Sequence, residues 1–244
     1  MATAAVSQTK HPERTGQHDR LFFSGVALLV LIGVSVGFAR TYFLAGAFWA
    51  KLPSVVVHIH GALFTLWIAL LVAQVALVAS RRTRWHMRLG IAGMFLAPLM
   101  VISGFASLIG AIKRRFVPPP VLQIITAQDI LLLCLFAFLI SWAFIARHDA
   151  PTHKRLVLCA TFVIIIPAIA RWPIMQNIEQ HLVVFYASVN SFPALLVVYD
   201  FWTRRSLQRA TIWGVGLMIA LQLAVPVLSQ SALIGHTIAW LQRT

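Results

Sequence analysis

Apolar stretches of about 20 residues recur along this sequence between short basic segments, and this pattern constrains the fold more than any motif. A helix of about 20 apolar residues is long enough to cross the hydrocarbon core of a bilayer. Hydrophobic residues make up 60% of the chain and charged residues only 11%, which is typical of integral membrane proteins. The sequence therefore predicts an all-α, polytopic transmembrane helical bundle without a soluble domain.

Seven of these stretches are long enough to be membrane spans. We expect a cytoplasmic tail at 1–20, a seven-helix transmembrane domain at 21–229 and a short outer tail at 230–244. Pro167, in the fifth stretch, is expected to bend or break its helix, because proline removes a backbone hydrogen bond. The expected spans are 21–39, 54–79, 89–112, 121–146, 156–172, 182–202 and 210–229.

The basic residues predict the orientation. With the amino terminus inside, the inner segments carry 13 of the 20 Lys and Arg residues and the outer segments carry 7. Basic residues are enriched in cytoplasmic loops, so this orientation is favoured. The net charge of +14 is then explained by loops that contact lipid headgroups, and no nucleic-acid partner is expected. Cys134 and Cys159 lie in separate spans and indicate neither a disulfide framework nor a zinc ribbon.

Polar side chains from four predicted spans share one depth near the outer face. With a helix rise of about 1.5 Å per residue, His60, Asp129 and Asn190 lie about 9 to 12 Å below that face, and Arg171 within about 8 Å of it. A charge inside a bilayer costs at least about 2.5 kcal/mol, so Asp129 and Arg171 are expected to face the bundle interior. This cluster, which includes Gln128, is interpreted as a ligand, proton or metal site, or as a pair that locks two helices together.

Two further histidines lie near this outer cluster. On a regular helix His58 and His60 point in nearly opposite directions, so only one of them can face the cluster. His60 lies on one stripe with Phe64 and Gln74 and is the inward candidate, while His58 is expected nearer the interface. His181, at the outer end of the sixth span, either faces His60 as a second ligand or belongs to a wet loop.

A second pair of histidines is predicted at the inner surface. His86 precedes the third span and His153 precedes the fifth, followed by Met-Arg-Leu and Lys-Arg-Leu respectively. Two imidazoles from different helices are what a six-coordinate haem iron requires, and they could begin a copper or zinc site. Solvated loop histidines are the alternative. About 26 residues separate His60 from His86, so one four-histidine site is excluded by the membrane thickness.

At another inner helix end, Asp200 and Arg204 are expected to form an exposed ion pair.

Several of these residues form motifs that resemble an uncharacterised family of bacterial multi-span membrane proteins, over roughly residues 40 to 175. The resemblance implies a helical bundle in the bacterial cytoplasmic (inner) membrane and no established activity. A looser similarity is to transmembrane b-type cytochromes, although Gln128 and Asp129 stand where a partner histidine for His60 would be needed. The motifs are His58-x-His60-Gly61, Trp67, Gln74, His86-x-x-Leu89-Gly90, His153-Lys154-Arg155-Leu156 and Arg171-Trp172-Pro173.

Three functional hypotheses follow. The first is a redox-linked membrane protein that binds haem b or a transition metal (copper, iron or zinc), for electron transfer or respiratory cofactor handling with a quinone or a respiratory complex. His86 and His153 would be the inner ligands and His60 with His181 the outer ones, with His58 as a further metal ligand. The second is a small-molecule or ion carrier that uses the outer polar cluster. The third is a structural accessory subunit of a membrane complex. Enzymatic activity is left open, but no hydrolase triad or nucleotide-binding loop is present.

Overall fold

The computed structural model describes residues 11–47, 54–115, 117–175 and 181–243, with the backbone alone for residues 11–15. Within these ranges the chain is helical and contains no β-strand. The elements are α1 (His11–Phe38), η1 (Ala39–Phe43), α2 (Val55–Ala79), α3 (Thr83–Arg114), α4 (Pro119–Ile145), α5 (Ala150–Ile164), α6 (Ile166–Ile169), η2 (Pro173–Met175), α7 (Leu182–Arg204), α8 (Arg209–Ser229) and α9 (Ala232–Leu241).

Six of the described helices are long and apolar enough to cross a membrane: α1 with η1, α2, α3, α4, α7 and α8. Their limits follow the apolar stretches of the sequence, with differences of a few residues at most ends. The largest differences are at the starts of α1 and α3, because the basic segments before the apolar stretches are themselves helical. His86 and His153, expected in loops just before their spans, therefore lie in the first turns of α3 and α5.

The fifth predicted span is interrupted. Helix α5 has 15 residues, and α6 adds 4 more after a break at Ile165. Pro167 lies two residues after the break; it has no backbone N–H to donate, and its ring clashes with the preceding turn. The expected bend at this proline is thus present, and neither half reaches the length of the other spans.

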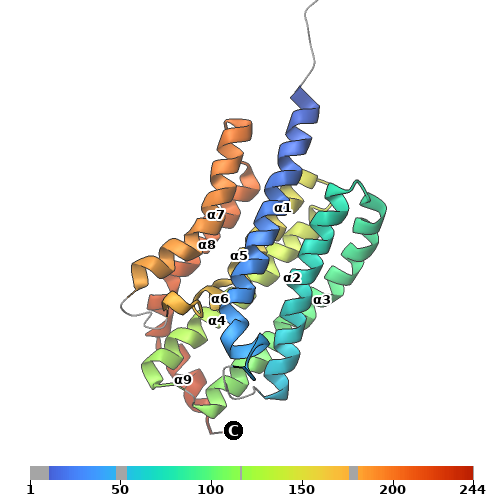
Figure 1. Ribbon diagram of the computed structural model, residues 1–244. Helices are drawn as coiled ribbons and strands as arrows, with labels where there is room; N and C mark the ends of the chain where they lie inside the picture. Colours follow the sequence, from blue (N-terminus) through green and yellow to red (C-terminus); the bar gives the residue numbers. More distant parts are fainter. Residues whose placement is uncertain (1–10, 48–53, 116, 176–180, 244) are drawn as a thin grey trace, which may run out of the picture.

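Figure 1 shows how the helices are arranged. The upper end, as drawn there, holds the starts of α1, α3, α5 and α8, and the lower end holds α9 and the carboxyl terminus. Helix α2 packs between α1 and α3, and α4 packs against α3, α5 and α8. Helices α7 and α8 form the side of the bundle opposite α3 (Figure 1).

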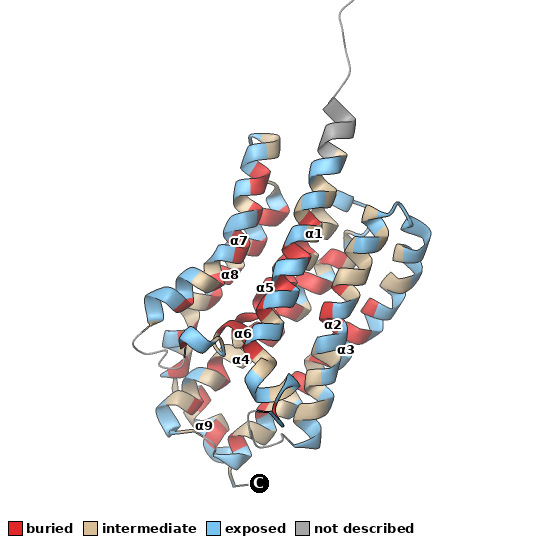
Figure 2. Ribbon diagram, in the orientation of Figure 1, coloured by how far each residue is buried: buried red, intermediate tan, exposed pale blue. Residues whose placement is uncertain are grey.

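Helix α5 is the centre of the core. Every residue from Leu158 to Ile166 is buried, whereas the long helices present exposed apolar side chains on their outer faces. Figure 2 shows the buried residues gathered around α5 and on the inward faces of its neighbours. A helix that is apolar on all sides is expected at the centre of a bundle, which explains how so short a helix is accommodated.

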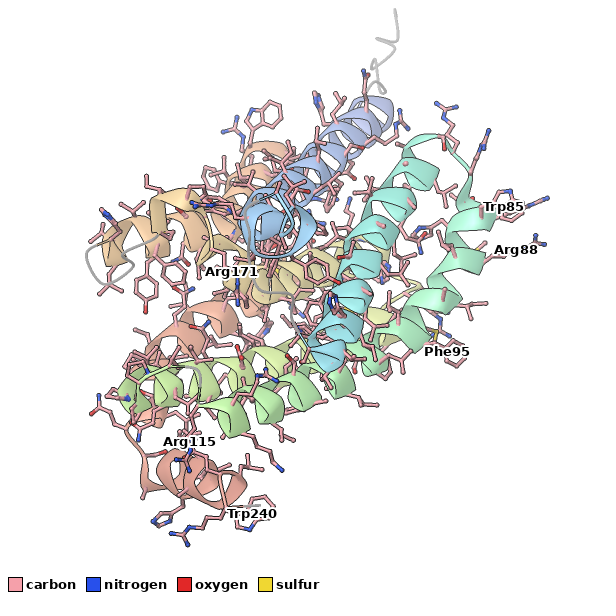
Figure 3. All side chains as sticks on the ribbon, turned by 60° about the horizontal axis from the view of Figure 1, so that its bottom comes forward. Trp85, Arg88, Phe95, Arg115, Arg171 and Trp240 are labelled. Carbon is pink, nitrogen blue, oxygen red and sulfur yellow. The ribbon has the colours of Figure 1, made fainter. Side chains whose placement is uncertain are left out.

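The outer surface has the distribution of side chains that a bilayer favours. Phe95 on α3 is 69% exposed and points away from the bundle (Figure 3). At the upper end, Arg88 lies over the Trp85 ring, 5.3 Å from its centroid, and at the lower end Trp240 and Arg115 project outward (Figure 3). Tryptophan beside arginine is typical of the interface between membrane and water. These features support a multi-pass membrane protein.

The segment expected as a short tail contains a helix. Helix α9 follows Ser231, whose hydroxyl accepts a hydrogen bond from the backbone N–H of Ile234 and caps the helix start. Its Ile234 and Ile238 pack against Leu108, Ile112 and Leu122 at the lower end of α3 and α4. This helix therefore covers the lower end of the bundle.

Candidate functional site

A cavity of about 630 Å³ opens at the upper end of the bundle, among α1 to α5. This volume is in the range of small-molecule and cofactor sites. Its walls are mainly apolar, and its polar groups gather where α3 and α5 begin. The polar and charged lining residues are Asp19, Arg20, Gln74, His86, Arg147, His148, His153 and Lys154.

His86 and His153, the two predicted inner candidates, meet in this cavity. Their ring centroids are 6.5 Å apart, and the ring planes are nearly perpendicular at 83°. The two histidines come from different helices, because α3 and α5 both begin at the upper end and each carries its histidine in the fourth helical position. The structure thus places two imidazoles with nearly perpendicular ring planes at the polar end of an apolar cavity.

The hydrogen bonds of these rings leave nitrogen atoms available. Nδ1 of His153 lies 2.8 Å from the carbonyl oxygen of Ala143, at the end of α4. When Nδ1 donates to that carbonyl, Nε2 carries the free lone pair, as in most metal-binding histidines. Nδ1 of His86 has no hydrogen-bond partner among the described residues, although the same ring interacts with the backbone of Gln74 on the facing turn of α2. Oε1 of Gln74 is likewise buried without a described partner. Buried polar atoms are normally hydrogen-bonded, so these two atoms are available to a polar ligand.

Small residues on α3 keep this cavity open. A methyl group at Gly93 would lie 3.3 Å from Leu70 and 3.8 Å from Phe144, and one at Gly90 would lie 3.5 Å from the amide nitrogen of Gln74. At the deep end, the Trp67 indole donates a 3.2 Å hydrogen bond to the hydroxyl of Thr161 on α5. The cavity walls are therefore fixed by side chains with defined positions.

An ion pair that the sequence did not predict holds α5 behind the cavity. Arg155 and Asp200 are both fully buried, and the guanidinium binds both carboxylate oxygens. Thr211 of α8 donates to the same carboxylate at 2.5 Å, and Arg155 also donates to the carbonyl of Pro151 at 2.8 Å. The expected exposed pair of Asp200 with Arg204 is wrong, because Asp200 points into the bundle.

A second network joins α1 to α5 and α7. Lys154 lies 2.5 Å from one carboxylate oxygen of Asp19, and the Tyr199 hydroxyl donates to the other. The Tyr199 ring stacks on Phe22 with centroids 3.9 Å apart, and Lys154 lies over the Phe23 ring at 4.6 Å. Both carboxylate oxygens of Asp19 are thus occupied, although this residue lines the cavity.

The predicted outer cluster lies at the lower end. Arg171 interacts electrostatically with both His60 and Asp129, and Figure 3 shows it near the centre of the bundle in that view. The guanidinium donates to the carbonyl of Pro167 at 2.7 Å and lies over the Phe38 ring at 5.1 Å. Among the described residues, Asp129 makes no direct ion pair, and Nδ1 of His60 is buried without a hydrogen-bond partner.

Asn190 and Gln128 belong to a neighbouring group. Asn190 and Gln222 of α8 exchange two amide hydrogen bonds, of 2.9 and 3.0 Å. Gln128 lines a small cavity together with Gln222, between α4, α7 and α8. His181 lies at the start of α7, and no contact among the described residues joins it to His60. The expectation that His60 and His181 face each other as ligands therefore stays a prediction without geometric support.

His58 has a different environment from His60. Its Nδ1 lies 3.4 Å from the hydroxyl of Tyr42 in η1, and that hydroxyl also donates to the His58 carbonyl at 3.3 Å. A methyl group at Gly61 would come within 3.1 Å of the Tyr42 ring. The His58-x-His60-Gly61 motif thus serves, in part, to seat Tyr42 against the start of α2.

No group of three or more His, Cys, Asp or Glu side chains in the described part of the chain is arranged to hold a metal ion. A closed zinc site normally needs four such ligands, whereas a haem needs only one or two axial ligands. His86 and His153 are thus fewer ligands than a closed zinc site uses, and as many as one haem iron can use. Comparison of the chain with protein-family models, curated proteins and solved structures finds no match.

Proposed function

We propose that this protein carries electrons in the bacterial cytoplasmic membrane by holding one b-type haem between His86 and His153. The observation that carries the proposal is the pair of imidazoles, with 6.5 Å between ring centroids, at the polar end of a cavity of about 630 Å³. A quinone or a respiratory complex would be the electron-transfer partner.

The spacing of the rings supports this assignment. Imidazole nitrogens bind metals at about 2 Å, so two imidazoles on one iron have their ring centres about 6 Å apart. His153 satisfies the further requirement that the non-binding nitrogen donates to a backbone carbonyl, here that of Ala143. Held by both His86 and His153, a haem would supply electron-transfer chemistry rather than oxygen activation.

The composition of the cavity supports a porphyrin rather than a hydrated ion. Trp67, Leu70 and Phe144 provide apolar walls, and Gly90 and Gly93 of α3 also line the cavity. When bound, haem supplies a one-electron couple. His86 and His153 would hold this group, and the apolar side chains of the cavity would orient it and exclude water.

The orientation belongs to the same proposal. The basic residues of the upper end favour an orientation with that end on the cytoplasmic side and the amino terminus inside. Helices α5 and α6 together would make the remaining crossing, for a total of seven. Their neighbours shield them from lipid, so they need not have the length of a lipid-facing span. The haem would then lie near the cytoplasmic face.

The test is a reduced-minus-oxidised absorption spectrum, with iron analysis, of protein purified in detergent from cells supplied with haem. The expected result is a low-spin b-type spectrum and about one iron per chain. Colourless, folded protein that does not take up added haem would overturn the proposal.

One observation favours a second candidate function, transport of a small ion or molecule through the lower cluster. Among the described residues, Asp129 lies near Arg171 without a direct ion pair and Nδ1 of His60 has no partner, so these polar groups could bind a ligand. Flux that Asp129→Asn abolishes, in protein without haem, would favour this candidate.

A further inference from the structure

The mouth of the upper cavity carries positive charge that the described carboxylates do not neutralise. Three cationic side chains line the cavity, Arg20, Arg147 and Lys154, against one carboxylate, Asp19. Lys154 and Tyr199 occupy both oxygens of that carboxylate. Among the described side chains, the charges of Arg20 and Arg147 therefore have no acidic partner.

The hydrogen bonds of the two arginines lead to the same conclusion. Arg147 donates only to the carbonyl of Phe144, at 3.2 Å, and Arg20 has no partner among the described residues. Each arginine carries five N–H donors in a planar fork that matches a carboxylate. Most of these donors are free to bind a ligand in the cavity.

The positions of these residues separate the cavity into two parts. Trp67 and Leu158 line its apolar part within the bundle, whereas Arg20 precedes the apolar stretch of α1 and Arg147 follows the end of α4. A ligand that fills both parts has a flat apolar body and anionic groups on one edge. Haem b has this form, with two propionates on one edge of an apolar ring.

We propose that Arg20 and Arg147 anchor the two carboxylates of the ligand in the upper cavity, so that the site selects a dianionic porphyrin over a neutral one. This inference rests on the proposed function, and it identifies which chemical groups of the ligand the chain recognises. Lys154 is excluded from the role because its ammonium group is already bound to Asp19.

The test compares two probes, haem b and its dimethyl ester, whose carboxylates are blocked. Both are titrated into haem-free full-length protein in detergent, with the Soret band as the readout. The wild type is expected to bind haem b at least about tenfold more tightly than the diester, because charge-assisted hydrogen bonds are stronger than neutral ones. Arg20→Gln and Arg147→Gln are each expected to weaken haem binding about tenfold while changing diester binding little.

Arg84→Gln is the matched control, because Arg84 is an exposed arginine on the same end of the bundle that does not line the cavity. Arg20→Lys tests charge alone and is expected to retain part of the preference. A second readout is the reduction potential, which is expected to fall in Arg20→Gln, because removing a nearby positive charge favours the ferric state.

The outcomes separate the two proposals. Wild-type protein that binds neither porphyrin overturns the haem assignment and this inference with it. Wild-type protein that binds both porphyrins equally tightly overturns this inference alone. This inference alone is also overturned if the arginine variants weaken the binding of haem b and of its dimethyl ester equally. That result is expected if the two arginines bind lipid phosphates or only support the fold.

Discussion

Arg155 of α5 and Asp200 of α7 form a fully buried ion pair. Arg155 lies two residues after His153 in the sequence. The carboxylate also accepts hydrogen bonds from Thr211 and from the backbone N–H of Gln208 at the start of α8. The pair therefore joins three helices and fixes the first turns of α5, which carry His153 into the cavity.

Asp200→Asn is expected to destabilise the protein by about 3 to 5 kcal/mol, because it leaves the Arg155 guanidinium buried without a counter-charge. Unfolding by heat or by SDS in mixed micelles measures the loss. Asp149→Asn, at an exposed carboxylate, is the control and should unfold like the wild type. Replacing both partners with apolar residues, as in Arg155→Met with Asp200→Leu, should restore much of the stability. Equal stability of Asp200→Asn and wild type would contradict the role of the pair.

Gly37→Ala is expected to disturb the packing of α1 on α6. A methyl group at this position would lie 2.2 Å from the carbonyl oxygen of Ala168, which is backbone and cannot rotate away. The cost of such overpacking is about 1 to 3 kcal/mol. Gly25→Ala is the matched control on the same helix, because nothing lies within 4 Å of its added methyl group. Thermal unfolding of both variants in detergent measures the loss of stability. A smaller loss for Gly37→Ala than for Gly25→Ala would show that α1 and α6 are not in contact at Gly37.

The Asn190 and Gln222 side chains are expected to couple α7 to α8. Their reciprocal amide hydrogen bonds predict a coupling energy of about 1 kcal/mol in a double-mutant cycle with Asn190→Leu and Gln222→Leu, near the values found inside other membrane bundles. The measurement is reversible unfolding of the two single variants and the double variant. Strictly additive effects would show that the two amides do not interact.

Asp129→Asn is expected to leave haem binding unchanged, because Asp129 lies near Arg171 in the lower cluster and does not line the upper cavity. The absorption spectrum and the iron content of the variant, compared with those of the wild type, measure this independence. Loss of the spectrum from folded Asp129→Asn protein would show instead that the two ends share one cofactor site.

The helices could be predicted from the sequence because long apolar runs report directly on membrane-length helices. The buried role of Arg155 could not, because it follows a run of polar and basic residues that marks a loop. Only the start of α5 at Ala150 places Arg155 in a helix that the bundle surrounds. Likewise, Asp200 and Arg204 have the spacing of a surface pair, and nothing local shows that Asp200 turns toward α5.

The candidate site was predicted in part. The equivalent positions of His86 and His153 before two spans suggested that they could be partners, and the structure brings their rings together. The cavity between them could not be predicted, because its volume depends on the small residues of α3 and on side chains from five helices. Apart from their charge, nothing in the sequence indicated that Arg20 and Arg147 line this cavity. His60 lies in a motif and His181 was paired with it by its expected position alone, and no described contact joins the two residues.

The most direct test of the central claim is the haem content of three full-length proteins purified side by side: wild type, His153→Ala and His60→Ala. The account predicts about one low-spin haem per chain in the wild type and in His60→Ala, because His60 lies at the opposite end of the bundle. It predicts loss of the low-spin spectrum in His153→Ala, because one axial nitrogen is removed. A His153→Ala protein that keeps the wild-type spectrum, or a wild type that folds and binds no haem, would contradict the account.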